Sequence, residues 1–296
     1  MAQSEHTPRF AVLEEALIIL FCQVDDIYYQ LNPQGGHYAS LKQLSDSEIL
    51  TLTLFQQLRG VESERSFLRE VARYFSHLFP GIVGFHPSSL HRRVRKLRRY
   101  LEPLRCAIVP ELVGEPETLI VDSTLLSVLH PRQVSRSAGF EGAAWVRWGS
   151  FSVYGVKLHL LCATNRVPIS YELTPANVAE VSLSEELLDE AELGEEVARK
   201  LLGDLAYRSH ELEEELAECG IALVTSEASA RRPGVRQQIE LAFSSLKRVF
   251  GLEETLARTL VGLATRIAAK MTAYTYAFLV NRMMSRPQGR IKELWA

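Results

Sequence analysis

The sequence predicts an all-helical N-terminal domain followed by an α/β domain, in which helices flank a mixed β-sheet. Up to residue 112, apolar residues recur at helical spacing between Pro and Gly breaks. From residue 118 onward, runs rich in Val, Ile, Leu, Tyr and Thr alternate with helical segments. A chain of 296 residues accommodates about two domains of roughly 100–200 residues each. We therefore predict domains at 1–112 and 117–285 and a C-terminal tail at 286–296.

Four short helices are expected in the N-terminal domain, joined by brief turns. Ser45 or Asp46 is a candidate N-cap for the second helix, and Pro103 is expected to end the fourth. This arrangement predicts a compact domain of the helix-turn-helix kind. The helices are expected at 16–31, 44–60, 63–81 and 86–104.

The second domain is expected to follow the order β-β-β-α-β-α-β-α-α, which predicts a mixed sheet with helices on its faces. A turn at Thr164–Arg166 predicts a hairpin between two strands, and a long polar and aromatic loop is expected at 130–150. The strands are expected at 119–129, 151–163, 167–174, 199–204 and 221–225. The helices are expected at 181–193, 209–220, 235–250 and 256–284.

The composition indicates an ordinary globular protein with a net charge of −3. The N-terminus lacks a signal-peptide pattern, and no apolar run approaches the ~20 residues needed to span a bilayer. The cysteines form no C-x-x-C pair and no zinc spacing. We therefore expect a cytoplasmic protein with no membrane partner and with reduced cysteines at Cys22, Cys106, Cys162 and Cys219.

Three acidic residues lie on separable elements of the second domain. Asp122 lies inside an apolar strand-like run, Asp204 closes another, and Glu240 lies on a helix-like run. An unpaired carboxylate would be costly to bury in an apolar strand, so a metal would explain Asp122. Carboxylates that converge from two strands and a helix can hold Mg²⁺, and a pair of such ions suits phosphoryl displacement. Taken alone, each acid has a simpler explanation, because most carboxylates in proteins are solvated surface groups.

Arg236, Glu240 and Lys247 form the pattern R-x₃-E-x₆-K along one edge of the predicted helix. This pattern resembles the signature around the third acid of the DDE transposases of bacterial insertion sequences, which carry an RNase H-like catalytic domain. In that family a Tyr often precedes the Arg by three residues, where this chain has Pro233. Given this signature, we expect Arg236 and Lys247 to contact DNA phosphates beside Glu240. The alternative is that they are ordinary helix-surface partners of Glu240.

The resemblance extends over residues 117–285. The strand at 155–160 is similar to the G-x-K-x-H strand of the family, and the following T-P-x-N turn also matches. Gly203–Tyr207 resembles the G-D-x-x-Y motif that contains the second acid. Lys157 and His159 share one face of their strand. Either these side chains contact phosphates near the metals, or they belong to a half-solvated strand face.

A dense basic run at 91–99 is expected to bind DNA, because like charges at helical spacing repel and a polyanion would stabilise them. A solvated helix face is the alternative. The basic residues that we expect to contact DNA here are Arg92, Arg93, Arg95, Lys96 and Arg99. In the loop before 151, Trp145, Arg147 and Trp148 are candidates for stacking on unpaired bases, or for core packing.

The resemblance implies a DNA transposase that binds terminal inverted repeats and carries out metal-dependent strand cleavage and strand transfer. It implies that Asp122, Asp204 and Glu240 hold two Mg²⁺ ions, with Mn²⁺ as a substitute. The partners would be double-stranded DNA, at the element ends and the target, and a second copy of the chain in a homodimer, at the nucleoid. The alternatives are a catalytically silent transposase-derived DNA-binding regulator and a metal-dependent nuclease without strand transfer.

Overall fold

The chain folds into two compact units. The computed structural model describes residues 8–34, 42–134, 140–179, 199–225, 233–254 and 256–295. One unit is helical and comprises Met1–Ile108 and Ala268–Ala296, while the other comprises Val109–Ile267 and contains the sheet. The sequence-based boundary assigned residues up to 285 to the second domain. The contacts instead group the C-terminal residues from 268 onward with the helical unit.

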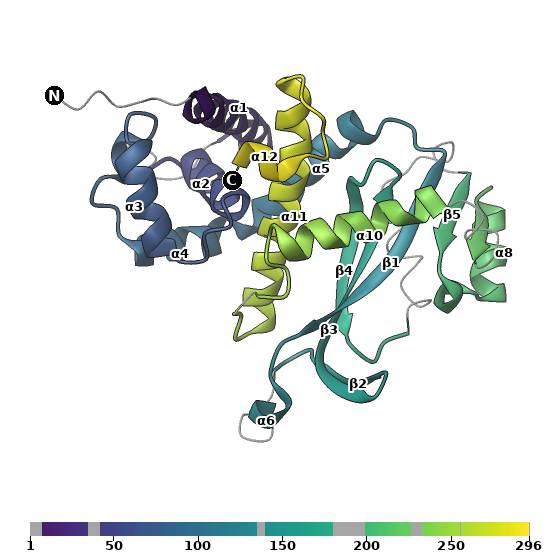
Figure 1. Cartoon of the computed structure of the whole chain (residues 1–296). Coiled ribbons are helices and arrows are strands. Elements are labelled where there is room, and N and C mark those ends of the chain that lie inside the picture. Colours follow the sequence, from purple (N-terminus) through teal and green to yellow (C-terminus); the bar gives the residue numbers. More distant parts are fainter. Residues whose placement is uncertain are drawn as a thin grey trace. The chain divides into compact units, whose positions relative to one another are not determined.

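The helical unit is built from an all-α N-terminal region, which agrees with the predicted fold class (Figure 1). Helix α2 begins after Ser45, one of the two predicted N-caps, and the cap is part of a capping box. Ser45 accepts from the amide of Glu48, and the Glu48 side chain accepts from the amide of Ser45. The helices of this unit are α1 (Pro8–Leu31), α2 (Asp46–Leu58), α3 (Glu64–Tyr74), α4 (Pro87–Leu97), α5 (Leu101–Val113), α11 (Leu260–Met283) and α12 (Ile291–Trp295), with 3₁₀ turns η2 (Pro80–Ile82) and η3 (Arg98–Tyr100); α5 and α11 extend into the second unit.

Helix α5 corrects the prediction that Pro103 ends a helix. Pro103 lies in the first turn of α5, where a missing backbone N–H breaks no intrahelical hydrogen bond. The proline therefore marks the start of a new helix that begins after the turn η3. The predicted C-terminal tail also contains a helix, because α12 buries Trp295 completely against Phe55.

The second unit contains the predicted mixed sheet. The strand order is β2-β3-β1-β5-β6, and β4 pairs with β3. Strand β3 runs antiparallel to β1, β2 and β4, whereas β5 runs parallel to β1 and β6. The strands are β1 (Thr118–Ser127), β2 (Ala144–Trp148), β3 (Phe151–Ala163), β4 (Pro168–Pro175), β5 (Lys200–Gly203) and β6 (Ala222–Thr225). Strand β2 lies within the region that the sequence analysis assigned to a loop.

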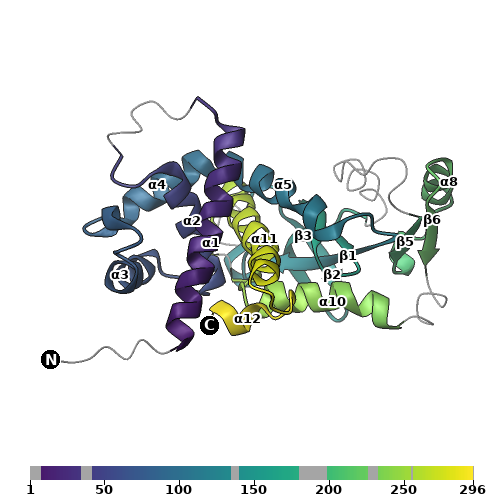
Figure 2. The ribbon, with the colours of Figure 1, turned by 90° about the horizontal axis from the view of Figure 1, so that it is seen from above.

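Helices cover both faces of this sheet. The unit also contains α6 (Pro131–Val134), η5 (Leu205–Tyr207), α8 (His210–Glu218) and α10 (Pro233–Arg248). Figure 2 shows α8 and α10 on opposite sides of the strands. The helix expected at 181–193 lies outside the described residues. Among the described helices, none is long and apolar enough to cross a membrane.

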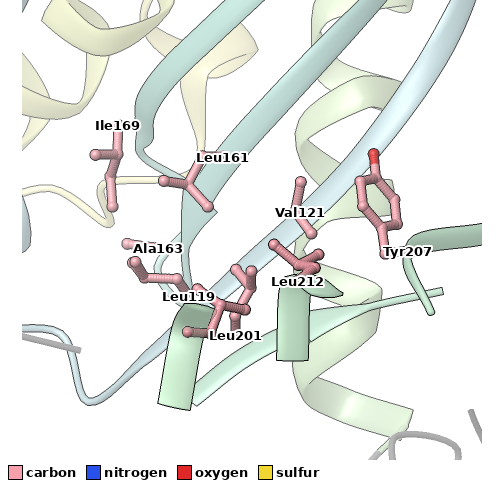
Figure 3. Packing of buried hydrophobic residues seen from close by; sticks show 9 residues of the cluster. Leu119, Val121, Leu161, Ala163, Ile169, Leu201, Tyr207 and Leu212 are labelled. Atoms are coloured by element: carbon pink, nitrogen blue, oxygen red, sulfur yellow. The ribbon is translucent and has the colours of Figure 1, made fainter. Parts of the chain in front are cut away.

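A buried apolar cluster fills the space between the sheet and α8. Leu119 and Val121 of β1 contribute to it from one face of the strand, and Leu212 and Leu216 contribute from α8. Val109 and Val113 of α5 pack against the same cluster. Figure 3 shows Leu119, Val121 and Leu212 gathered on one side of the strands together with Tyr207. The other face of β1 therefore faces α10, which contacts this strand.

Candidate functional site

Strand register brings Asp122 level with Asp204. Strands β1 and β5 run parallel, with Leu119 opposite Leu201 and Ile120 opposite Leu202. Continuing this register by two residues places Asp122 beside Asp204, which directly follows β5. Two carboxylates far apart in the sequence thus lie at the same level on neighbouring strands.

Asp122 projects from the face of the sheet that α10 covers. Side chains alternate along a strand, and Val121 belongs to the cluster under α8, so Asp122 faces the other side. Helix α10 lies on that side (Figure 2). On α10, Ile239 is fully buried and the adjacent Glu240 is exposed. Asp122 thus lies on the sheet face that α10 covers, whereas Glu240 is an exposed residue of α10 itself.

Each aspartate accepts a hydrogen bond from a backbone amide one or two residues later in the chain. Asp122 accepts a hydrogen bond of 2.8 Å from the amide of Ser123. Asp204 caps the turn η5 by accepting from the amide of Ala206 at 2.8 Å. The following Tyr207 is fully buried and packs so closely on Gly203 that a Cβ at position 203 would lie 3.0 Å from the Tyr207 Cβ. Gly203 thus allows the tight turn that sets the direction of Asp204.

The three predicted acids are carboxylates, whose oxygens suit a divalent cation. Among the described residues, no group of three or more His, Cys, Asp or Glu side chains is close enough to hold a metal ion. Asp204 and Glu240 make no ion pair within the described part of the chain. Lys247 pairs with Glu253 at 2.8 Å, rather than with Glu240. Carboxylate oxygens without a competing cation are the ligands that Mg²⁺ prefers.

Lys157 and His159 lie on the opposite face from Asp122. The β1–β3 register pairs Asp122 with Leu160 and Ser123 with His159, and paired residues share a face. His159 is fully buried and its Nε2 lies 3.0 Å from Thr174 Oγ1. Lys157 is 9 % exposed and donates to the carbonyl of Val178 at 2.9 Å. This placement favours a structural role for both side chains over phosphate contact. Both side chains are also too buried for a half-solvated strand face.

The β2–β3 hairpin carries exposed aromatic residues on the Asp122 face. Trp145 pairs with Tyr154, and both alternate in phase with Leu160, the partner of Asp122. The Trp145 side chain is 46 % exposed and its ring centroid lies 5.3 Å from that of Tyr154. Trp145 is therefore a surface residue, as is Arg147. The side chain of Trp148 lies outside the described part of the structure.

Helix α4 presents most of the predicted basic residues to solvent. Pro87 occupies its first turn and the His86 side chain caps it. Leu90 and Leu97 are buried on the inner side. The exposed basic residues are Arg92, Arg95 and Lys96 on α4 and Arg98 and Arg99 on η3. Arg95 and Lys96 make no ion pair with the described residues, so this segment forms a basic surface.

Arg93 differs from its neighbours because it faces the interior of the helical unit. Its guanidinium donates to the carbonyl of Leu44 and forms an ion pair with Asp46, and the Arg93 side chain is 18 % exposed. The sequence predicts that Arg93 contacts DNA. Its ion-pair partner lies 47 residues earlier in the chain, so no local sequence pattern reveals the pair. The structure favours a packing role for Arg93.

Comparison with known proteins gives one family match. The profile of a family described as "Transposase DDE domain" matches residues 114–276, more than half of the chain. No curated protein matches the chain significantly. A solved structure described as "Crystal structure of a pre-cleavage Mos1 transpososome" aligns with 10 % identity over 81 % of this chain and 79 % of that chain. Its TM-score is 0.25, which is too low to carry an argument about this chain.

Proposed function

Because this chain belongs to the family of transposase DDE domains, we propose that it binds the terminal inverted repeats of an insertion sequence and cuts and rejoins DNA there. Members of such a family cleave and transfer DNA strands. The observation that carries the assignment to particular residues is the register between β1 and β5, which brings Asp122 level with Asp204. Glu240 would complete the set from α10, the helix that covers the Asp122 face of the sheet.

Asp122, Asp204 and Glu240 are the residues that would hold Mg²⁺, as two ions, with Mn²⁺ as a substitute. When bound, such ions activate the attacking oxygen and stabilise the leaving oxygen of a phosphodiester. The protein's part is to hold the carboxylates on elements whose positions the sheet determines. Arg236 and Lys247 lie on α10 on either side of Glu240 and would contact the phosphates of a DNA strand beside it.

The exposed basic surface of α4 and η3 is proposed to bind the element ends. Arg92, Arg95, Lys96 and Arg99 would contact phosphates, so the affinity should depend strongly on salt. Joining two ends in concert requires two such sites, so the active complex would be a homodimer assembled on the two ends and the target DNA. Light scattering of the protein with end DNA tests this, since a single chain that joins paired ends excludes the dimer. We expect the protein at the nucleoid.

A second candidate function is a DNA-binding regulator without catalysis. It is supported by one observation, that the three acids do not form a metal-binding cluster among the described residues. A nuclease without strand transfer is a related alternative. These functions differ in what happens to the DNA after binding.

The deciding experiment uses two labelled duplexes that carry the element's terminal sequence, one intact and one pre-cut to expose a 3′-OH. With Mg²⁺, a transposase cuts the first and joins the second to target DNA. A nuclease only cuts the first, and a regulator shifts both duplexes in a gel without changing them. The last outcome would contradict the proposed catalytic function.

A further inference from the structure

Asp46, at the start of α2, is surrounded by hydrogen-bond donors from three parts of the helical unit. Lys42 Nζ lies 2.5 Å from Asp46 Oδ2, and the Tyr28 hydroxyl donates to the same oxygen at 3.1 Å. Arg93 of α4 pairs with Asp46 Oδ1. The Asp46 side chain is 13 % exposed. One carboxylate thus joins the end of α1, the start of α2 and the middle of α4.

The same network reaches the far end of the basic surface. The Tyr28 ring packs edge-on against that of Tyr100, with centroids 5.0 Å apart. The Arg99 guanidinium lies 4.9 Å from the centre of the Tyr100 ring and donates to its hydroxyl at 3.1 Å. Asn32 donates to the Tyr28 hydroxyl at 2.9 Å, which fixes the orientation of that group. Asp46 is therefore connected through Arg93 to the helix that carries the basic surface, and through two rings to Arg99 of the surface itself.

The loop before α2 reinforces this connection. Arg93 also donates to the carbonyl of Leu44, a fully buried residue. Next to it, Gln43 donates to the carbonyl of Val83 at 3.1 Å, and a Cβ at Gly81 would lie 1.9 Å from the Gln43 carbonyl oxygen. The backbone at residues 43 and 44, just before Asp46, is therefore fixed by contacts with Arg93 on one side and with Gly81 and Val83 on the other.

The pKa of the Asp46 carboxyl agrees with these contacts. Burial acts to raise the pKa of Asp46, but hydrogen bonds and charge from Lys42 and Arg93 outweigh burial, and the pKa lies below its usual value. The charge of Asp46 contributes in turn, after burial, to raising the pKa of Tyr28 to about 12. Asp46 is thus ionised, and Tyr28 remains a hydrogen-bond donor, at neutral pH.

We propose that Asp46 is a positioning residue for DNA-end recognition, holding α4 and η3 at the angle at which their exposed side chains meet the bases and phosphates of the element end. The inference rests on the proposed function, because it requires that this basic surface bind DNA. It makes an unusual prediction: an acidic residue strengthens specific binding to a polyanion. Simple electrostatics predicts the reverse, since removing a negative charge should strengthen DNA binding.

The test compares two duplexes of equal length, one with the element's terminal sequence and one with that sequence shuffled. In Asp46→Asn we expect the preference for end DNA to fall by about tenfold, the effect of losing one base contact. Affinity for the shuffled duplex should stay equal or increase, because all the exposed cations remain. Tyr28→Phe, which removes one hydrogen bond and no charge, should lower the preference in the same direction by a smaller factor. Asp46→Glu should restore part of it.

Asp26→Asn is the matched control, because it removes the same charge from an exposed position of α1 and should leave the preference unchanged. A purely structural role for Asp46 would lower both affinities by the same factor and leave the preference for end DNA unchanged. If Asp46→Asn folds and discriminates like the wild type, the inference is overturned. If Asp46→Asn does not fold, Tyr28→Phe decides, and an unchanged preference in that variant overturns the inference.

The double variant Arg95→Ala/Lys96→Ala separates this inference from the proposed function. If it binds end DNA as tightly as the wild type does, the basic surface does not bind DNA and both ideas fail. If it binds weakly while Asp46→Asn keeps full discrimination, only the positioning role fails.

Discussion

The two regions that carry the proposed function are held in place by different interactions. In the α/β unit, backbone register between β1 and β5 brings Asp122 level with Asp204. In the helical unit, the basic helix α4 is fixed by side chains, which include the buried Leu90 and Leu97 and the ion pair of Arg93 with Asp46. A strand ladder orders many residues at once, whereas a side-chain network depends on each member. The catalytic face should therefore tolerate more surface change than the DNA-binding surface.

The largest effect is expected from the acids that lie outside β1. Asp204→Asn and Glu240→Gln should each lower DNA cleavage by at least about a thousandfold, the scale seen when an electrostatic group essential to the transition state is removed. End binding in a gel shift should persist, because it rests on the other unit. Near-normal cleavage by either folded variant would remove that residue from the site.

Gly155 tests the role of strand register. It pairs with Ser127 of β1 and Ala144 of β2, and a Cβ there would lie 2.1 Å from the carbonyl oxygen of Leu126. Gly155→Ala should lower the free energy of unfolding by about 1–3 kcal/mol, because the backbone must shift. Urea denaturation measures this. Gly234→Ala is the control, since a Cβ there meets nothing within 4 Å. Equal stability of both variants would contradict the register argument.

Asp46 gives the helical unit a sensitivity to acid. Its pKa in the folded state lies below the usual 3.8, so the folded state binds fewer protons than the unfolded state. The stabilisation is present above pH 3.8 and is lost as the pH falls below it. At neutral pH, Asp46→Asn should lower the free energy of unfolding by about 1.5–3 kcal/mol, the range for hydrogen bonds to charged groups.

Urea denaturation of both proteins at several pH values checks this expectation. The difference between wild type and Asp46→Asn should shrink in acid. A difference that stays constant from pH 7 to below pH 3.8 would show that the charge of Asp46 is not what stabilises the unit.

The smallest effect is expected at Lys247. Its ion pair with Glu253 is partly exposed, with side chains 33 % and 53 % accessible, and such pairs contribute about 0–1 kcal/mol. Lys247→Met should therefore leave the melting temperature nearly unchanged, and Glu253→Gln should do the same. If Lys247 also contacts DNA, only Lys247→Met reduces the salt dependence of binding, by about one unit of log–log slope. Equal salt slopes in both variants would exclude the DNA contact.

Much of the sheet could be predicted from the sequence because its signals are local. The run at 151–163 matches β3 residue for residue, and the turn at Thr164–Arg166 is the hairpin to β4. Strand β2 was missed, although the exposed Trp145 and Arg147 alternate with the half-buried Ala144 and Val146, as a strand requires. Strand β2 is short and follows a polar segment, so the sequence pattern does not predict it.

Lys157, His159 and Arg93, three of the predicted DNA contacts, have surroundings that the sequence does not reveal, because distant partners decide their burial. Lys157 and His159 do share a face, as alternation predicts, but that face is turned away from Asp122. Arg93 has the same local sequence context as Arg92 and Arg95, and only the position of Asp46 distinguishes it. Helical periodicity and strand alternation give relative directions within an element, whereas the orientation of the whole element depends on tertiary packing.

The central claim is that one face of β1 is catalytic and the other is structural. Neighbouring residues of the strand test it directly, because Asp122 and Ser123 point to opposite faces. Cleavage of a labelled element end with Mg²⁺ should be abolished in Asp122→Asn and retained in Ser123→Ala, while both variants shift end DNA in a gel as the wild type does. Cleavage by folded Asp122→Asn at a rate near that of the wild type would contradict the account.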